Sequence, residues 1–437
     1  MDEQFFHYLW KFRLLNPDLR LTTGESITIL NPGDYNHDGG PDFFNARIRI
    51  GTTTWAGNVE IHGKSSDWFR HGHQHDKAYD TIILHVVYQQ DKEIRSQNND
   101  LIPTLELKGQ YPEALSLNYR SIILSQQWIP CYSMMSVYPK HEFSLWAPGL
   151  VMERLQQKMR GICSLWESCG KDWEEALYRY LSLSFGFRIN GLPFELLAKS
   201  LPLKIIIRHG DELFRKEALL FGMSGLVGPG LKDDYPLALQ SEFEYLSKKY
   251  NLHPIPKGLW KHLRLRPSNF PCIRISQWAA FLNHNRGNLF NMLEVNDVME
   301  WTEKFGVVAS EYWDDHFTFD RLSPHSPKEM GTASIYLLII NALVPFLFFY
   351  SNLQGNPGLA EKALLFLDQL PGETNAEIKE WAKAGMPVKT ALNTQALLHL
   401  KRHYCDAKRC LECRIGNRIL KAESHEKERN DQGLPVL

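Results

Sequence analysis

Two short runs near the N-terminus carry the side chains best suited to bind a metal ion. The run NPGDYNHDGGPDFF contains Asp38 and Asp42, and the run GNVEIHGK contains Glu60, His62 and Lys64. Carboxylates are the hard ligands that Mg²⁺ and Mn²⁺ prefer. A bound divalent ion neutralises a phosphate and lowers the pKa of water. Together these runs are suited to metal-assisted hydrolysis of a phosphodiester.

The stretch that contains the two runs is typical of a β-hairpin. NARIRIG and TTWAGNVEIHG are rich in β-branched residues and are separated by a short turn. Strand alternation sends Glu60, His62 and Lys64 to one face and Ile61 to the other. Asp42 precedes Glu60 by 18 residues, a separation that a hairpin can close. We therefore expect the acidic side chains to meet on neighbouring strands.

GPDF, the hairpin and VEIHGK resemble the PD-(D/E)xK superfamily of restriction-endonuclease-like nucleases. The resemblance implies that Asp42 and Glu60 hold Mg²⁺ or Mn²⁺ from adjacent strands. It also implies a lysine, two residues after the glutamate, that orients the attacking water. This chain has His62 at that position, so either His62 replaces the lysine or Lys64, next on the same face, takes its role. Further candidate ligands of the same ion are Asp38 and Glu25.

A calcium loop and an ordinary polar turn are the alternatives for the first acidic run. Asp34, Asn36, Asp38 and Asp42 follow the pattern D-x-N-x-D-G-x-x-D, which resembles the calcium loops of integrin-type propeller repeats. Those loops recur from blade to blade, whereas this chain has one copy. The twelfth position, where an EF-hand has glutamate, is Asn45. Asp, Asn and Gly are also the usual residues of hairpin turns.

A connection rich in titratable residues follows Glu60. Its members are Asp67, His71, His73, His75 and Asp76, and His85 lies in the apolar run TIILHVV beyond them. So many ionisable groups around one acidic strand are costly to bury unless they are paired or used. The connection therefore supports a functional site over a polar turn.

The segments around both acidic runs, together with RPSNFPCIRI and the cysteine-rich end, resemble an uncharacterised bacterial family, domain of unknown function 2851. The resemblance extends over most of the chain. It implies no established activity, so the nuclease hypothesis depends on the pattern of the site.

The C-terminal stretch HYCDAKRCLECRIGN predicts a second metal site. It contains His403, Cys405, Cys410 and Cys413. Clustered thiolates in a reducing compartment favour zinc, and a Cys₃His site is the most economical arrangement. The fourth ligand could instead be a distant cysteine, from the set Cys131, Cys163, Cys169 and Cys272. Some nucleases that resemble the same superfamily hold an iron–sulfur cluster with one upstream cysteine and three near the C-terminus, so such a cluster is the second hypothesis.

Basic residues gather in two stretches that could contact nucleic acid. The first stretch, in which Trp260 and Phe270 are interleaved, contains Lys257, Lys261, Arg264, Arg266 and Arg274. The second, at the cysteine-rich end, includes Arg409 and Arg414. Basic side chains contact phosphates, and aromatic rings stack on bases. The formal net charge is only −1, so any nucleic-acid binding depends on such local patches.

The element pattern divides the 437 residues into three parts. Short β-branched segments flanked by helical ones predict an N-terminal α/β (α+β) domain with a mixed sheet, restriction-endonuclease-like, at residues 1–135. Helical periodicity predicts an all-α domain at 136–400 and leaves a cysteine-rich tail at 401–437. The apolar segment Thr332–Asn352 is long enough to cross a membrane, but Asn341 and Pro345 favour a buried core helix that is kinked or ended at the proline.

The sequence thus predicts a cytoplasmic, metal-dependent nuclease that acts on DNA or RNA. The odd number of cysteines, seven, argues for reduced thiols, and the first residues lack a targeting signal. Two alternatives remain: a nucleic-acid-binding or scaffold protein that kept the fold and lost catalysis, and a calcium-stabilised binding protein.

Overall fold

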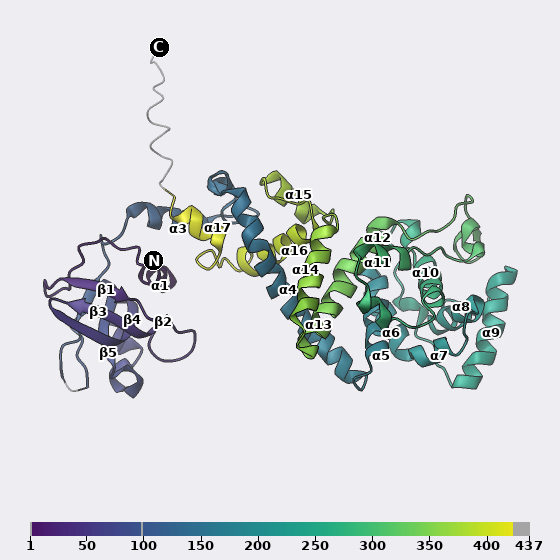
Figure 1. Cartoon of the computed structure of the whole chain (residues 1–437), viewed down its shortest axis with the longest axis horizontal. Helices are drawn as coiled ribbons and strands as arrows, with labels where there is room; N and C mark the ends of the chain where they lie inside the picture. The colour runs from purple at the N-terminus through teal and green to yellow at the C-terminus, as the bar shows by residue number, and fades with distance from the viewer. Residues whose placement is uncertain (1, 98, 423–437) are drawn as a thin grey trace, which may run out of the picture. The chain divides into compact units, whose positions relative to one another are not determined.

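The computed structural model describes residues 2–97 and 99–422, which divide into two compact units (Figure 1). One unit comprises Met1–Pro139 together with Lys401–Leu437, and the other comprises Lys140–Leu400. The cysteine-rich tail is therefore part of the N-terminal unit as far as residue 422. Positions 423–437 of the predicted tail lie outside the described residues.

The N-terminal unit contains a mixed six-stranded sheet, as the sequence predicts. Its strands are β1 (Ile27–Asn31), β2 (Asp34–Tyr35), β3 (Phe43–Ile50), β4 (Thr53–Lys64), β5 (Ile82–Gln89) and β6 (Thr104–Glu106). The order is β1-β3-β4-β5-β6, and β2 pairs with β3. The pairs β1–β3 and β3–β4 are antiparallel, whereas β5 runs parallel to β4 and β6. The sheet thus changes from antiparallel to parallel at β4.

The predicted hairpin is formed by β3 and β4. Its tight turn contains Gly51, whose φ of +55° suits a residue without a Cβ. In β3 the buried and exposed positions alternate, with Ala46 and Ile48 facing the core. The middle of β4 is buried at four successive positions, Val59 to His62. Strands β4 and β5 are covered on both faces there, so polar side chains of this segment must find partners inside the unit.

Helix α1 (Glu3–Lys11) packs against β4 with its apolar face. Asp2 caps its N-terminus, and Phe5, Phe6, Leu9 and Trp10 are buried. The other helices of the unit are α2 (Asp67–Arg70), α3 (Glu113–Leu124) and α17 (Arg414–Leu420).

The C-terminal segment is docked on α3. The side-chain amide of Asn118 donates to the carbonyls of Leu420 (3.3 Å) and Ala422 (3.1 Å) at the end of α17. The ammonium of Lys408 donates to the carbonyl of Ile123 (2.6 Å). These bonds satisfy carbonyls at the ends of both helices, which have no partner within the helix.

The second unit is almost wholly helical. Its helices are α4 (Lys140–Ser168), α5 (Trp173–Phe185), α6 (Phe187–Ser200), α7 (Leu203–Ile207), α8 (Leu213–Met223), α9 (Asp234–Tyr250), α10 (Pro271–His284), α11 (Val298–Lys304), α12 (Thr332–Leu338), α13 (Val344–Gln354), α14 (Pro357–Gln369), α15 (Ala376–Lys383) and α16 (Ala391–Leu400). It also contains an antiparallel pair of short strands, β7 (His316–Thr318) and β8 (Arg321–Leu322), so the expectation of an all-α domain needs this correction. The strands β7 and β8 are too short to show an alternation of apolar and polar residues in the sequence.

The apolar segment forms one continuous helical stretch from α12 to α13. Pro345 does not end it, because the turn Ile339–Leu343 is π-helical. A proline leaves the carbonyl four residues earlier without its helical donor, and here the hydroxyl of Tyr180 donates to that carbonyl, of Asn341 (3.3 Å). Thr332–Gln354 is long and apolar enough to cross a membrane by composition, and 67% of its most apolar window is buried inside the unit.

Helix α8 carries a buried carboxyl group at the centre of a hydrogen-bond network. Glu217 accepts from the hydroxyls of Ser276 (2.6 Å), Ser310 (2.8 Å) and Tyr235 (2.7 Å). Burial raises its pKa above the usual value despite these donors. The folded state therefore retains a proton on Glu217 at a pH where the unfolded chain has lost it.

We expect Glu217→Gln to flatten the pH dependence of stability in this window. The wild-type free energy of unfolding should fall as pH rises from about 4.5 toward the raised pKa, by about 1.4 kcal/mol per pH unit relative to the variant. Urea unfolding at several pH values between 4.5 and 7.5 measures the difference. The control is Glu361→Gln, at an exposed position of α14. Parallel curves for wild type and Glu217→Gln would contradict the expectation.

Candidate metal centre

Asp42 and Glu60 are held next to each other where β3 begins. Phe43, the first residue of β3, pairs with Val59 on β4. Asp42, which precedes Phe43, therefore lies next to Glu60, which follows Val59. The backbone N–H of Asp42 donates to Glu60 Oε2 (3.1 Å), and the backbone N–H of Ile61 donates to Asp42 Oδ2 (2.9 Å). This reciprocal pair of bonds orients both carboxylates. Asp42 and Glu60, the two acids that the sequence predicts as metal ligands, are therefore neighbours, as expected from the hairpin.

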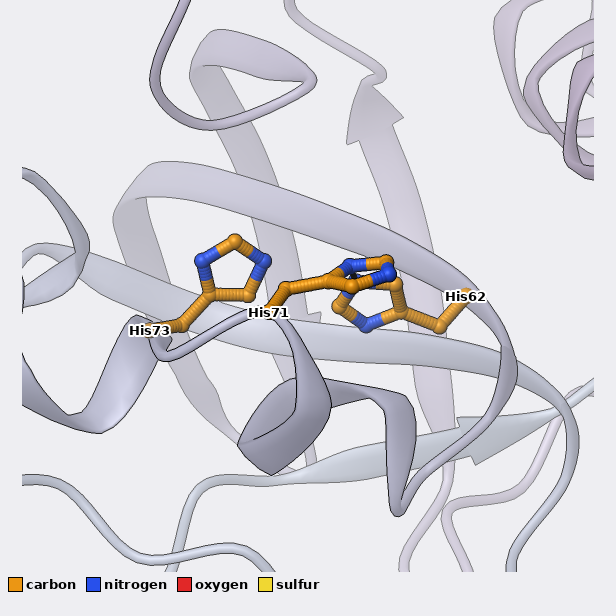
Figure 2. Close-up of side chains that lie close together, drawn as sticks. All are labelled: His62, His71 and His73. Atoms are coloured by element: carbon orange, nitrogen blue, oxygen red, sulfur yellow. Dashed lines mark hydrogen bonds between the residues drawn. The ribbon is translucent and has the colours of Figure 1, made fainter.

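Histidines from three segments surround Glu60. His62 lies on β4, and His85 lies on β5, where it pairs with Glu60. His71 and His73 come from the connection after α2. His62 Nδ1 and His85 Nε2 are 2.8 Å apart and form a hydrogen bond. His62 Nε2 lies 3.1 Å from His71 Nδ1. Figure 2 shows the rings of His62, His71 and His73 gathered above the sheet.

One carboxylate oxygen of Glu60 joins this group. Glu60 Oε1 lies 3.4 Å from His62 Nε2 and 3.3 Å from His73 Nε2. Ligand atoms of His62, His71 and His73 all lie within 4.8 Å of one another, and no other trio of metal-ligating residues in the described part of the chain does so. Three imidazoles and a carboxylate at such distances are a ligand set for a divalent transition metal.

The buried imidazoles of the strands are held neutral. Burial, followed by the neighbouring imidazoles, lowers the pKa of His62 to about 2, and burial lowers the pKa of His85 to about 3. Burial also raises the pKa of Glu60. The ring nitrogen Nδ1 of His85 is buried without a hydrogen-bond partner. Neutral imidazole is the form that binds metal, so the neutral rings of His62 and His85 fit a metal centre.

Helix α1 adds a histidine to the other side of the acid pair. His7 Nε2 lies 3.2 Å from Asp42 Oδ2, and His7 Nδ1 lies 3.2 Å from the hydroxyl of Tyr35. One turn earlier, Glu3 accepts from the backbone N–H of Gly63 (3.3 Å). Burial acts to lower the pKa of His7, but the hydrogen bond and charge of Asp42 outweigh it and raise the pKa overall. The contact with Asp42 therefore favours the protonated form of His7.

The remaining candidates of the acidic site lie outside this group. Lys64 is exposed at the end of β4, and its backbone N–H donates to Asp67 (3.0 Å). Glu25 lies in an exposed turn, where it accepts from the hydroxyl of Thr23. Asp38 is exposed as well. Of the two residues that could take the role of the lysine, His62 rather than Lys64 lies beside Glu60.

The first acidic loop is organised by an asparagine side chain. The amide of Asn36 donates to the carbonyls of Asp38, Gly39 and Pro41, and its oxygen accepts from the backbone N–H of Asp38 (2.9 Å). The carboxylate of Asp42 meanwhile accepts from Ile61 on β4. The loop therefore stabilises itself as an Asx-type turn, and the residues of the calcium pattern are directed to different partners.

Four cysteines of the N-terminal unit form a second group, here termed the thiol cluster: Cys131, Cys405, Cys410 and Cys413. All four are buried and none is in a disulfide. Cys131 immediately precedes the 3₁₀ turn Tyr132–Val137, Cys413 immediately precedes α17, and these two elements pack together. Burial raises the pKa of Cys405, and the other three thiols raise it further. The distant Cys131 thus meets the three cysteines of the tail.

The backbone around the thiol cluster is shaped to approach sulfur. The N–H of Gly416 points at Cys413 Sγ (3.5 Å). A Cβ on Gly416 would lie 2.1 Å from the carbonyl oxygen of Cys410, so only glycine allows this approach. No three sulfurs of the thiol cluster lie within 4.8 Å of one another, because within the described ranges only the histidine trio meets that condition.

The predicted basic surfaces are only partly exposed. Lys257, Lys261, Arg264 and Arg266 are exposed, but Arg274 is 5% exposed, so its assignment to a nucleic-acid surface is wrong. It belongs to the buried face of α10. Trp260 is also buried, and its indole N–H donates to the carbonyl of Ser224 (2.8 Å), which removes it from base stacking.

The second basic stretch lies on the docked tail. Arg414 is exposed on α17, and the guanidinium of Arg409 forms a forked ion pair with Glu412. Half-buried His403 lies two residues before Cys405. The thiol of Cys131, by contrast, lies close enough to Cys405 and Cys413 to raise their pKa values, which favours Cys131 as the partner of the three tail cysteines.

Fold and site together define an α+β protein with a histidine–carboxylate centre, joined to a helical unit. Residues 3–376 match the family model described as "Protein of unknown function (DUF2851)". The chain belongs to this family, which confirms the resemblance seen in the sequence. No curated protein and no solved structure matches the chain.

Proposed function

We propose that this protein is a metal-dependent nuclease that hydrolyses phosphodiester bonds of DNA or RNA. The observation that carries the proposal is the pair Asp42 and Glu60, fixed side by side where the antiparallel strands β3 and β4 pair, beside a group of three imidazoles. That is the placement of the two acids that the restriction-endonuclease-like resemblance implies. Glu60 lies in the buried middle of β4, the strand at which the pairing changes from antiparallel to parallel.

The ligand set favours Mn²⁺ over Mg²⁺. Carboxylate oxygens suit both ions, but Mg²⁺ is bound through oxygen and water and rarely through imidazole. Here His62, His71 and His73 present nitrogens beside Glu60. His62 can present Nε2 to the ion while its Nδ1 is bonded to His85, an outer partner that fixes the ring.

The residues of the centre can take different roles in hydrolysis. The bound ion would supply charge neutralisation and a water of lowered pKa. Glu60 and Asp42 would hold the ion, and their hydrogen bonds with backbone N–H groups keep the hairpin in register. His62, in place of the lysine, is neutral and can serve as a ligand. His7, which lies beside Asp42 and whose pKa is raised, would be the proton donor to the leaving group.

Cleavage of labelled single- and double-stranded DNA and RNA tests the proposal. The full chain is first stripped of metal with a chelator and then given Mn²⁺ or Mg²⁺. We expect cleavage of at least one substrate, faster with Mn²⁺ than with Mg²⁺ at equal concentration. Calorimetric binding of Mn²⁺ without cleavage of any substrate would contradict the nuclease. That result would favour the catalytically inactive nucleic-acid-binding or scaffold protein, whose motivating observation is His62 in the position of the lysine.

We further propose that the thiol cluster holds a structural iron–sulfur cluster rather than one zinc ion. A tetrahedral zinc site with Zn–S bonds of about 2.3 Å places its sulfurs roughly 3.8 Å apart. Among the described residues, no three of these sulfurs all lie within 4.8 Å of one another. An iron–sulfur cluster binds its thiolates through different irons, which suits a wider spacing. The buried thiols, whose pKa values are raised, would be deprotonated by the metal.

A further inference from the structure

The second unit contains a buried arginine that has no acidic partner. Arg274, on α10, is 5% exposed. Its guanidinium donates to Gln277 Oε1 (2.9 Å), Ser334 Oγ (2.9 Å) and Asn269 Oδ1 (2.5 Å), all of them neutral acceptors. Within residues 2–97 and 99–422, no carboxylate forms an ion pair with it. Its positive charge is therefore buried without an opposite charge.

The arginine also retains an unused donor. Its Nε–H is buried and has no hydrogen-bond partner. Burial alone lowers the pKa of Arg274 to about 10, and no neighbouring charge offsets this effect. Burying a charge without an opposite charge destabilises the fold, and an orphaned donor adds to that cost. An anion bound beside the guanidinium would remove both penalties.

The guanidinium lines a cavity of about 170 Å³. The polar part of the wall is formed by Asn190, Asn269, Arg274 and Ser334. The apolar part is formed by Phe185, Phe187, Ile189, Phe194, Leu265 and Leu337. The ring of Phe187 lies over the guanidinium, 4.5 Å from its carbon. The wall thus combines one cation and three neutral polar side chains with a larger number of apolar ones.

The backbone at this wall is strained. Phe187 has a φ of +47°, in the left-handed region that bulky residues rarely adopt. Asn190, three residues on, is non-helical and kinks α6. A Cβ on Gly186 would lie 2.2 Å from the carbonyl oxygen of Asn190, so glycine is required for the kink. Such strain persists where surrounding structure enforces it, commonly at ligand sites.

We propose that this cavity binds a small monocarboxylate with an apolar, ring-sized body. A cavity of about 150 Å³ in another protein accommodates benzene, so about 170 Å³ suits one ring and one charged group. The site contains one cation, and a singly charged carboxylate matches that charge. A phosphate monoester carries up to two charges and needs more donors than the cavity offers. The carboxylate would accept from Arg274 Nε while the ring packs on Phe187.

Thermal unfolding of the full chain with benzoate, phenylacetate and isovalerate as probes tests the proposal. We expect at least one acid to raise the Tm saturably, by roughly 2–4 °C at high excess over its Kd. Benzamide, which has the same ring without the charge, should give no shift. Arg274→Gln should abolish the shift, and Arg264→Gln, at an exposed position, should leave it unchanged.

A second variant keeps the test decisive if Arg274→Gln does not fold. Leu265→Trp fills the cavity and leaves the guanidinium intact, so it too should abolish the shift. The proposal is overturned if none of the three acids gives a saturable shift, or if the shift survives both variants. It is overturned equally if phenyl phosphate binds more tightly than every carboxylate.

Discussion

Replacing Glu60 with glutamine is expected to reduce metal-dependent cleavage at least about 100-fold, since even loss of an outer partner of a metal ligand costs 10- to 100-fold. Glu60 Oε1 faces His62 and His73, and its Oε2 accepts from Asp42. An amide keeps the shape but removes the negative charge that the ion requires. Because the amide group is isosteric, the fold should be retained.

Two measurements separate the chemical effect of Glu60→Gln from a structural one. Cleavage rates with Mn²⁺ report the activity, and calorimetric titration of Mn²⁺ reports the centre itself. Both should be lost together, while circular dichroism stays unchanged. Glu25→Gln is the matched control, because Glu25 is exposed in a turn and should retain full activity. Cleavage that survives Glu60→Gln would place the activity elsewhere and contradict the assignment of the centre.

The second large effect is expected from Cys131→Ser, which should remove most of the metal bound at the thiol cluster. Cys131 is far from the tail in sequence, yet it lies with Cys405, Cys410 and Cys413. Metal binding at such sites is coupled to folding. Without it, the docked segment that ends in α17 should detach more readily from α3. Limited proteolysis should then cut the C-terminal segment sooner than in the wild type.

Metal and sulfide content measure this effect directly. The wild-type protein, purified without oxygen, should contain iron and acid-labile sulfide and absorb visible light. Cys163→Ser is the control, because Cys163 lies in the second unit and should leave the content unchanged. Stoichiometric zinc without iron would contradict the iron–sulfur assignment while keeping the site. Full metal content in Cys131→Ser would remove Cys131 from the ligand set.

The largest gap between sequence and structure concerns groups that come from distant segments. Arg274 looked like one of a row of surface cations, and no local pattern distinguishes it from Arg266, which is exposed. Its burial depends on how α10 packs. His7 also lacked a local signal, since a histidine on an amphipathic helix is ordinary. It became part of the centre only because α1 packs on β4.

The sequence by itself determined the mixed sheet, the helical second unit and the neighbourhood of Asp42 and Glu60. These follow from short-range rules: strand alternation sets the faces, and a tight hairpin sets the register. Only the tertiary structure decided that His71, His73 and His85 gather around His62 beside Glu60, that Cys131 joins the tail cysteines, and that Arg274 is buried beside a cavity. The physical reason is that such contacts depend on the packing of segments distant in sequence, which residue spacing does not encode.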